Sequence, residues 1–397
     1  MSGSEEFYRI KQLPPYVFEE VNRLKAQLRA QRRDIIDLGM GNPDMPTPPH
    51  IVEKLCETAH DPKAHRYSVS RGIIGLRKAM ARYYERRFHV RLNPETEIVA
   101  TLGSKEGFAN LAQAITAPGD VILSPNPAYP IHAYGFIIAG GVIMPVPALT
   151  PEQYLSGLSE ALGKAHMTPR AMVLNYPSNP TAQMVGLDFY KDAVALARKH
   201  DIIILSDLAY SEIYFDAPPP SIFEVQGAID IAVEVNSLSK TFAMAGWRVG
   251  MAVGNARLIA ALARVKSYLD YGAFTPIQVA AVAALDSPEE VIDGIRTIYK
   301  NRRDVLIDAF AKAGWEIPAP EASMFAWAPI PERFRDMGSV EFAKLLMEKA
   351  EVAVAPGLGF GEMGDGHVRI GLVENQQRIR QAARNLRKVF STESATC

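Results

Sequence analysis

The chain has 397 residues, of which 48% are hydrophobic and 22% charged, as is typical of a globular protein of about two or three domains. Its formal net charge of −1 gives no indication of nucleic acid or an anionic membrane as a partner. The two cysteines are too few for a disulfide framework, and the eight histidines lack the paired spacing of metal ligands. Because the N-terminus has no apolar signal and no apolar run approaches the ~20 residues of a membrane span, we expect a cytoplasmic protein.

Residues 1–47 are predicted to form an N-terminal arm and one helix that pack with a smaller C-terminal domain. The helix is indicated by apolar residues at helical spacing, namely Phe18, Val21, Leu24 and Leu28. A short strand is expected at 35–38. The proline-rich connector that follows it leads into a larger domain.

Residues 48–286 alternate between helical and strand patterns, which predicts a large α/β domain with a mostly parallel sheet covered by helices. Strands are expected at 98–101, 121–124, 172–175, 202–207, 232–236 and 251–253. Helices are expected at 50–59, 76–88, 104–115, 188–200 and 256–267. In such sheets ligands bind beyond the carboxyl ends of the strands, where the polar residues considered below cluster.

Residues 287–397 are predicted to form the small C-terminal α/β domain. A long helix begins this domain after Ser287-Pro288 and is expected to run to about residue 313. Strands at 325–328, 352–355 and 367–372 and helices at 340–350 and 375–390 follow. The tail at 391–397 is expected to be disordered.

Lys240 lies just after a predicted strand, with hydroxyl groups at Ser237 and Ser239 and an arginine at Arg248. A lone lysine is usually exposed, but this combination is more specific. A lysine amine condenses with a carbonyl, and burial or nearby cations favour its neutral, reactive form. Hydroxyl and guanidinium groups bind phosphate. The pattern therefore predicts pyridoxal phosphate, an aldehyde cofactor that carries a phosphate.

Asp207 follows a run of four large aliphatic residues at 202–205. A carboxylate at the end of a buried strand needs a cationic partner, and a protonated pyridine nitrogen is one such partner. Alternatively, Asp207 caps the next turn.

Two further turns follow predicted strands. Gly103, Ser104 and Lys105 begin a helix whose N-terminus would suit a phosphate, although Ser104 alone is also an ordinary cap. Tyr129 stands among prolines, where its ring could stack on a pyridine ring or simply pack in the loop.

Arg369 interrupts an apolar strand and needs a bidentate partner, for which an internal acid would serve. Asn179 stands in a Ser-Asn-Pro turn after the strand at 172–175.

The segment around Lys240 resembles the lysine signature of the fold-type I, class I/II aminotransferases, and the other motifs follow in the family's order over nearly the whole chain. The resemblance implies the three-layer fold of that family and a Lys240 that holds pyridoxal 5′-phosphate, which alternates with pyridoxamine 5′-phosphate. It assigns the phosphate to Ser237, Ser239, Arg248, Gly103, Ser104 and Lys105.

The resemblance places the ring of the cofactor beside Tyr129, Asp207, Tyr210 and Asn179. It implies that Arg369 binds the substrate α-carboxylate with help from Gly41 and Asn179. It also implies a homodimer with shared active sites, because the tyrosine that matches Tyr67 reaches the phosphate of the neighbouring subunit.

Within the family the chain looks closest to bacterial glutamate–pyruvate (alanine) aminotransferases, on stretches such as 13–18, 40–44 and 268–272. We therefore expect ping-pong transfer between L-alanine and 2-oxoglutarate, in which Lys240 moves a proton from the substrate Cα. Aspartate-specific relatives have an arginine in the segment that matches 268–275, and this chain has none there. For the distal carboxylate of glutamate the candidates are Tyr16, Arg71 and Lys105.

Several alternatives keep the same fold. An LL-diaminopimelate or aspartate aminotransferase, or a C–S β-lyase, would use the same lysine and aspartate. A transcription regulator built on this fold would need a DNA-binding domain, and residues 1–47 contain no basic helix-turn-helix pattern.

Overall fold

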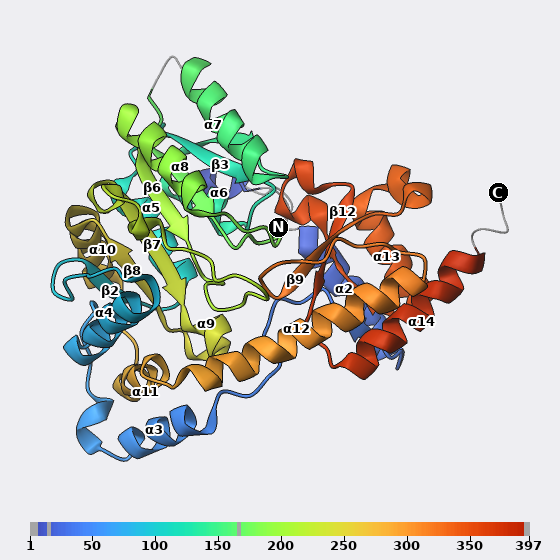
Figure 1. Cartoon of the computed structure of the whole chain (residues 1–397), viewed down its shortest axis with the longest axis horizontal. Helices are drawn as coiled ribbons and strands as arrows, with labels where there is room; N and C mark the ends of the chain where they lie inside the picture. The colour runs from blue at the N-terminus through green and yellow to red at the C-terminus, as the bar shows by residue number, and fades with distance from the viewer. Residues whose placement is uncertain (1–6, 14–16, 165–167, 393–397) are drawn as a thin grey trace.

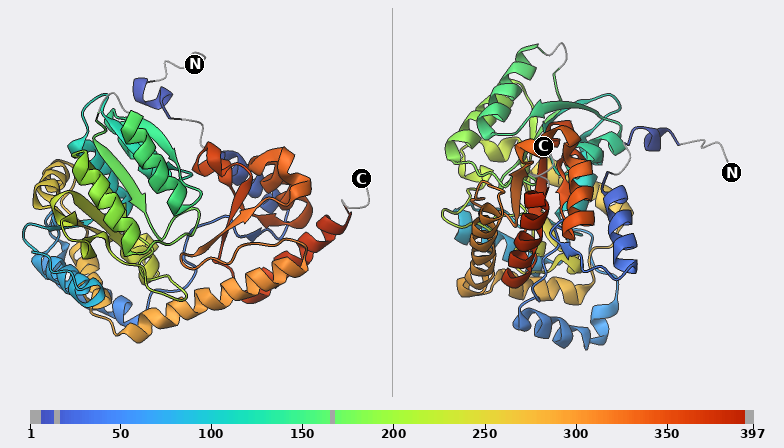
Figure 2. Two further views of the ribbon diagram at one scale, coloured as in Figure 1. Left: turned by 45° about the horizontal axis from the view of Figure 1, so that its top comes forward. Right: turned by 90° about the vertical axis from the view of Figure 1, so that its right-hand side faces the viewer.

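The computed structural model describes residues 7–13, 17–164 and 168–392. It consists of a large α/β body and a smaller group of helices and strands beside it (Figure 1). The long helix α12 (Glu289–Lys312) runs from the body to the smaller group, as both views that show its full length make clear (Figures 1 and 2).

The body is built on a seven-stranded sheet with the order β2-β8-β7-β6-β5-β3-β4. Only β8 runs antiparallel to its neighbours, and the four remaining pairings are parallel. The prediction of a mostly parallel sheet is therefore confirmed. In sheet order the strands are β2 (Ile98–Thr101), β8 (Gly250–Gly254), β7 (Ala232–Ser237), β6 (Ile203–Asp207), β5 (Ala171–Asn175), β3 (Val121–Asn126) and β4 (Val142–Pro147).

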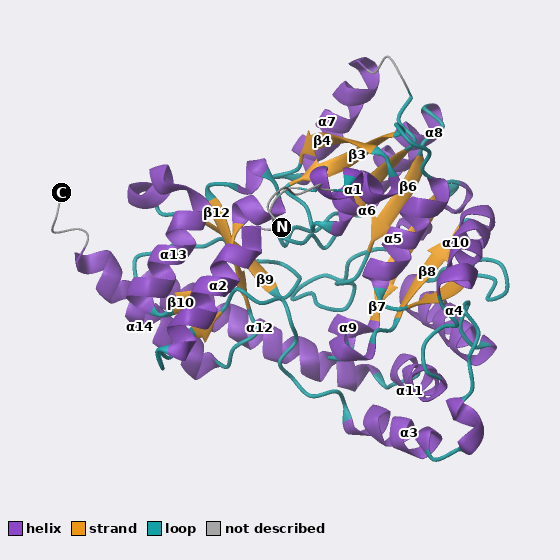
Figure 3. Cartoon of the chain, turned by 180° about the vertical axis from the view of Figure 1, so that it is seen from behind, coloured by secondary structure: helices purple, strands orange, loops and turns teal. Residues whose placement is uncertain are grey.

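Helices cover both faces of this sheet, which gives three layers. Alternate residues of a strand face opposite layers: Ile203 and Leu205 of β6 pack into one core, and Ile204 packs into the other. The first face is covered by α5 (Ser104–Ile115), α6 (Ile131–Ala139) and α10 (Ala256–Leu269). The second is covered by α3 (Pro49–Ala59), α4 (Ile74–Phe88), α7 (Pro151–Lys164), α8 (Leu187–Lys199) and α11 (Thr275–Leu285). Seen from behind, α3 and α11 lie side by side (Figure 3).

The smaller group contains a three-stranded antiparallel sheet with the order β11-β12-β9. Its elements are β9 (Phe325–Pro329), α13 (Gly338–Ala350), β11 (Ala355–Pro356), β12 (His367–Gly371) and α14 (Gln376–Thr392). The N-terminal helix α2 (Val17–Ala30) packs on α13, and β1 (Ile36–Asp37) pairs with β10 (Val352–Ala353). The chain thus enters the smaller group first, crosses to the body, and returns through α12.

The differences from the predicted elements have identifiable physical causes. The helices α6 and α11 were not predicted, because they are apolar with little one-sided pattern, and β4 was missed because two prolines interrupt it. The helix α7 was missed although Tyr154, Leu158 and Leu162 recur at helical spacing.

Two predictions for the smaller group were wrong in detail. The strand predicted at 352–355 is divided into β10 and β11, which belong to different sheets. The disordered tail does not begin at residue 391, because α14 continues to Thr392, and residues 393–397 lie outside the described residues. None of the described helices has both the length and the apolar character needed to cross a membrane.

Candidate active site

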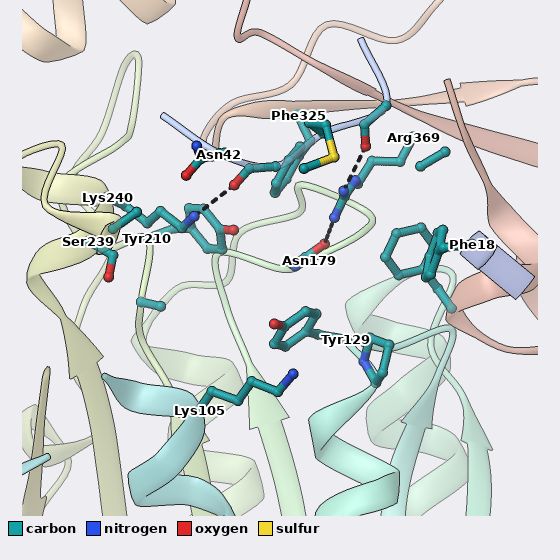
Figure 4. Close-up of a pocket in the computed structure, with 18 of the residues that line it drawn as sticks. Phe18, Asn42, Lys105, Tyr129, Asn179, Tyr210, Ser239, Lys240, Phe325 and Arg369 are labelled. Carbon is teal, nitrogen blue, oxygen red and sulfur yellow. Dashed lines mark hydrogen bonds between the residues drawn. The ribbon is translucent and has the colours of Figure 1, made fainter. Parts of the chain in front are cut away.

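A cavity of about 490 Å³ opens where the carboxyl ends of the central strands face β12 and the segment before α3. It brings together predicted site residues from seven separate stretches of the chain (Figure 4). Those that line it are Gly41, Ser104, Lys105, Tyr129, Asn179, Asp207, Tyr210, Ser237, Ser239, Lys240, Arg248 and Arg369.

Lys240 lies in the short helix α9 (Leu238–Thr241), which begins where β7 ends and is capped by the Ser237 hydroxyl. The Lys240 ammonium donates a hydrogen bond to the carbonyl oxygen of Gly41 at 2.8 Å (Figure 4). Burial, and then the nearby charges of Arg369 and Arg248, lower the pKa of Lys240 to about 8. The neutral, nucleophilic form of this amine is therefore far more populated near neutral pH than that of an exposed lysine.

Asp207 is the last residue of β6 and is buried. Its Oδ2 lies 2.9 Å from Nε2 of His132, and its Oδ1 accepts a hydrogen bond from the backbone of Ala209 at 3.1 Å. The His132 ring comes from the first turn of α6 and is fully buried. His132 was not predicted as a site residue. Its position three residues after Tyr129 was the one feature of the sequence that could have indicated it.

The proposed phosphate end of the cavity combines a helix N-terminus with a guanidinium group. Gly103 precedes α5 with φ at +86°, and a Cβ there would lie 2.2 Å from Nη2 of Arg248. Arg248 is fixed by donating to the carbonyls of Ala245 at 2.9 Å and Leu102 at 3.1 Å. Its charge is therefore directed at the start of α5, where free N–H groups favour an anion.

Tyr129, Lys105 and Tyr210 project toward the same space (Figure 4). The Lys105 ammonium lies 5.9 Å from the centroid of the Tyr129 ring. The Tyr210 ring meets the edge of Phe325, with the centroids 5.6 Å apart. Burial raises the pKa of the Tyr210 phenol, so this group remains protonated at neutral pH and can donate a hydrogen bond.

Arg369 occupies the opposite end of the cavity from Lys240 (Figure 4). It donates to Oδ1 of Asn179 at 2.7 Å, and its guanidinium lies 3.9 Å from the centroid of the Phe325 ring. Asn179 is held in turn, because its backbone N–H donates to Asn175 at 2.9 Å and the Asn175 amide donates to the backbone carbonyl of Asp207 at 3.0 Å. The carboxyl ends of β5 and β6 thereby fix the position of the arginine.

Three predicted residues lie elsewhere. Tyr67 is 86% exposed, outside the cavity, and stacks on Tyr271 with centroids 4.7 Å apart. Arg71 is not among the cavity residues and donates to the backbone carbonyls of Glu95 and Ile98. Tyr16 lies outside the described residues.

Pyridoxal phosphate fits the charges of this cavity. Among the described residues, Lys240 has no carboxylate partner, Asp207 has no lysine or arginine partner, and Arg248 bonds only backbone carbonyls. An aldehyde, a pyridinium nitrogen and a phosphate would complement these three groups in turn. The three partners are the functional groups of one molecule.

Known proteins that resemble this chain are also aminotransferases. A model of the family "aminotransferase class I and II" matches residues 33–386. The chain is 66% identical to the putative aminotransferase AatC of Rhizobium meliloti (strain 1021), over 99% of this chain and 97% of that protein.

Two other groups of relatives differ in their substrates. The chain is 50% identical to the glutamate-pyruvate aminotransferase AlaC of Escherichia coli (strain K12), over 98% of this chain and 94% of that protein. It is 40% identical to the LL-diaminopimelate aminotransferase of Moorella thermoacetica, over 97% and 98%. Among solved structures, substrate-bound BacF from Bacillus subtilis superposes with a TM-score of 0.88, at 37% identity over 96% of each chain.

Proposed function

The chain belongs to the aminotransferase class I and II family, whose members use pyridoxal 5′-phosphate, and we propose that it transfers an amino group between L-alanine and 2-oxoglutarate. Pyruvate and L-glutamate are the products. The placement of Lys240 and Arg369 at opposite ends of one cavity supports a substrate that carries an amino group and a carboxylate. The similarity to the glutamate-pyruvate enzyme supports the choice of alanine and glutamate.

Each end of the cavity has a separate task in this proposal. Arg369 binds the α-carboxylate, and its bond to Asn179 keeps the guanidinium in the orientation needed for a bidentate contact. Lys240 would move the proton from Cα of the amino acid to the C4′ carbon of the cofactor, and in the reverse direction during the second half-reaction. The lowered pKa of Lys240, about 8, suits a group that must both accept and donate a proton near neutral pH.

When bound, pyridoxal phosphate would supply an electron sink. Asp207 would hold a proton on the ring nitrogen, and His132 keeps the Asp207 carboxylate oriented through the 2.9 Å contact. Tyr210 and Asn179 would donate hydrogen bonds to the ring oxygen, and Tyr129 would pack on the ring face. Ser104, Ser237, Ser239 and Arg248 would hold the phosphate, with Lys105 at the same end.

A second candidate, an LL-diaminopimelate aminotransferase, is favoured by one feature of the cavity. Its wall extends to Asn22 and to the ion pair between Lys25 and Asp37, whose charged atoms lie 2.8 Å apart. A substrate with a second amino acid group at its far end would meet both charges of that pair. L-Alanine would leave this part of the cavity to solvent.

A spectrum of the purified protein mixed with L-alanine and no acceptor tests the proposal. We expect the visible band of the bound cofactor to fade while about one pyruvate per active site is released, as ping-pong transfer requires. Addition of 2-oxoglutarate should restore the band and yield glutamate. If the protein binds the cofactor and responds to LL-diaminopimelate but not to alanine, the second candidate replaces the first.

The surface near α10 and α11 supports the further proposal of a homodimer. A cytoplasmic location stays a prediction from the sequence. Tyr67, Tyr268 and Tyr271 are 86%, 75% and 63% exposed, and Leu269 and Val69 lie among them in the same two segments. So many exposed apolar side chains are unusual for a monomer and typical of a protein interface. In such a dimer Tyr67 would reach the phosphate of the neighbouring subunit.

A further inference from the structure

Lys266 is a fully buried lysine of α10 that takes no part in the cavity. Its ammonium lies 3.0 Å from Oε1 of Glu106 and 2.9 Å from Oδ2 of Asp270. A buried ammonium is costly unless charged partners compensate it, so a structure retains one only where its partners hold it tightly. The two carboxylates belong to segments that lead to different parts of the proposed active sites.

Glu106 connects Lys266 to the phosphate end of the cavity. It stands in the first turn of α5, the helix whose N-terminus is at the proposed phosphate position. Its Oε2 accepts a hydrogen bond from the backbone N–H of Leu102 at 2.8 Å, and the Leu102 carbonyl accepts one from Arg248. The same glutamate therefore fixes the turn that orients Arg248.

Asp270 connects Lys266 to the exposed aromatic segments. Its Oδ1 accepts a hydrogen bond from the backbone of Gly272 at 2.7 Å, and its backbone carbonyl accepts one from the Ser70 hydroxyl at 2.5 Å. These contacts hold together the two segments that contain Tyr67 and Tyr271, whose rings pack against each other. One ammonium group thus links the phosphate end of its own cavity to the residues proposed to reach the partner's cavity.

The charge of Glu106 is poorly placed for a neighbouring anion. A carboxylate in the first turn stabilises a helix, but it also opposes the binding of a phosphate dianion at the same N-terminus. Like charges repel more strongly where burial limits the screening by solvent. Lys266, which does not line the cavity, supplies the compensating positive charge to Glu106.

We propose that Lys266 is a positioning residue for the cofactor phosphate, which acts by neutralising the charge of Glu106 in the first turn of α5. The inference rests on the proposed location of the phosphate at the start of α5. It assigns no contact between Lys266 and the cofactor. Its effect is on how tightly the phosphate is held.

The test compares three variants of the full chain for their affinity for pyridoxal phosphate: Lys266→Met, Glu106→Gln and the double variant. Affinity is measured on the cofactor-free protein from the growth of the visible band during titration. We expect Lys266→Met to weaken binding about tenfold or more, because it leaves Glu106 uncompensated beside the phosphate. The double variant should return to within about threefold of the unsubstituted protein, because the repelling charge is then gone.

A purely structural role for Lys266 gives a different result. If the double variant binds as weakly as Lys266→Met, or if Lys266→Met binds as tightly as the unsubstituted protein, the inference is wrong. If Lys266→Met fails to fold, the cofactor affinity of the Glu106→Gln variant alone still tests the inference. It should bind the cofactor at least as tightly as the unsubstituted protein, and tenfold weaker binding would overturn the inference.

Lys344→Met is a matched control. Lys344 also bridges two carboxylates, those of Glu20 at 2.5 Å and Glu341 at 2.8 Å, but it lies in α13 away from the phosphate end. Its substitution should leave cofactor affinity unchanged. Failure of the unsubstituted protein to bind pyridoxal phosphate would instead contradict the proposed function.

Discussion

At the scale of single residues, the reactivity of the candidate site depends on an amine that has no carboxylate partner among the described residues. Among the residues that the structure describes, Lys240 bonds only the Gly41 carbonyl, and burial, followed by the charges of Arg369 and Arg248, lowers its pKa. The neutral amine is therefore available at a pH where an exposed lysine is protonated. Its neighbours, more than its position in the sequence, give it this property.

The pH dependence of cofactor capture tests this account. We expect the rate at which the cofactor-free protein acquires its visible band to rise with pH and to level off above about 8, because only the neutral amine attacks an aldehyde. Arg369→Gln should move the midpoint to higher pH, since it removes one of the positive charges that lower the pKa of Lys240. A rate that still rises steeply through pH 10 would contradict the lowered pKa.

Arg369 offers a second prediction at this scale. Arg369→Lys should reduce kcat/KM for L-alanine by about 100-fold, or roughly 3 kcal/mol, because an ammonium cannot reproduce a bidentate contact with a carboxylate. The visible band of the bound cofactor should remain. Arg303→Lys is a suitable control, because Arg303 also stacks on a phenylalanine, 4.6 Å from the Phe215 ring, but does not line the cavity.

At the scale of elements, the connection from β2 to α5 is constrained by the close approach of Arg248. Gly103 provides the turn with φ at +86°, and the missing side chain leaves the space that the guanidinium occupies. A residue other than glycine at position 103 could still join β2 to α5. Its Cβ would, however, displace Arg248 from the N-terminus of α5.

Two glycine substitutions separate backbone strain from this steric effect. Gly103→Ala and Gly119→Ala both place a Cβ at positive φ, +86° and +89°, but only the first would collide, with Arg248. We expect each to cost about 1 kcal/mol of stability, and only Gly103→Ala to weaken cofactor binding about tenfold or more. Thermal unfolding and cofactor titration measure the two effects. Equal cofactor affinity in the two variants would show that Arg248 can move without consequence.

At the scale of the whole molecule, the site depends on the way the chain crosses between its two parts. Gly41 and Lys240, which share a hydrogen bond, are 199 residues apart, and Arg369 and Asn179 are 190 apart. The crossings before α3 and through α12 bring these residues together. A second subunit would extend the same principle by adding Tyr67 to each cavity.

A mixing experiment tests whether the active sites are shared. We expect twice the mass of one chain in sedimentation, and little activity from either Lys240→Ala or Tyr67→Ala alone. Dissociated and reassociated together, the two variants should recover about a quarter of full activity, because half of the dimers are mixed and each mixed dimer has one intact site. No recovery beyond the sum of the separate variants would indicate that each subunit holds a complete site.

The sequence by itself determined most of the elements and the chemistry of the main site residues. Buried strands such as β5 and β6 are largely apolar runs, and polar residues stand at their ends and in the turns that follow. Asn179, Asp207 and Lys240 could therefore be located before any contact was known. Local patterns of this kind are visible because they repeat within a few residues. The resemblance to a family then connected them to one cofactor.

Only the tertiary structure decided which distant groups meet. The contact of His132 with Asp207, the bond of Arg369 to Asn179, and the ion pair of the buried Lys266 with Glu106 join residues that are far apart along the chain. The sequence pattern could not predict them, because such contacts depend on how helices and strands pack and not on local periodicity. For the same reason the burial of Lys240 and the charges around it, which lower its pKa, became visible only once the chain was folded.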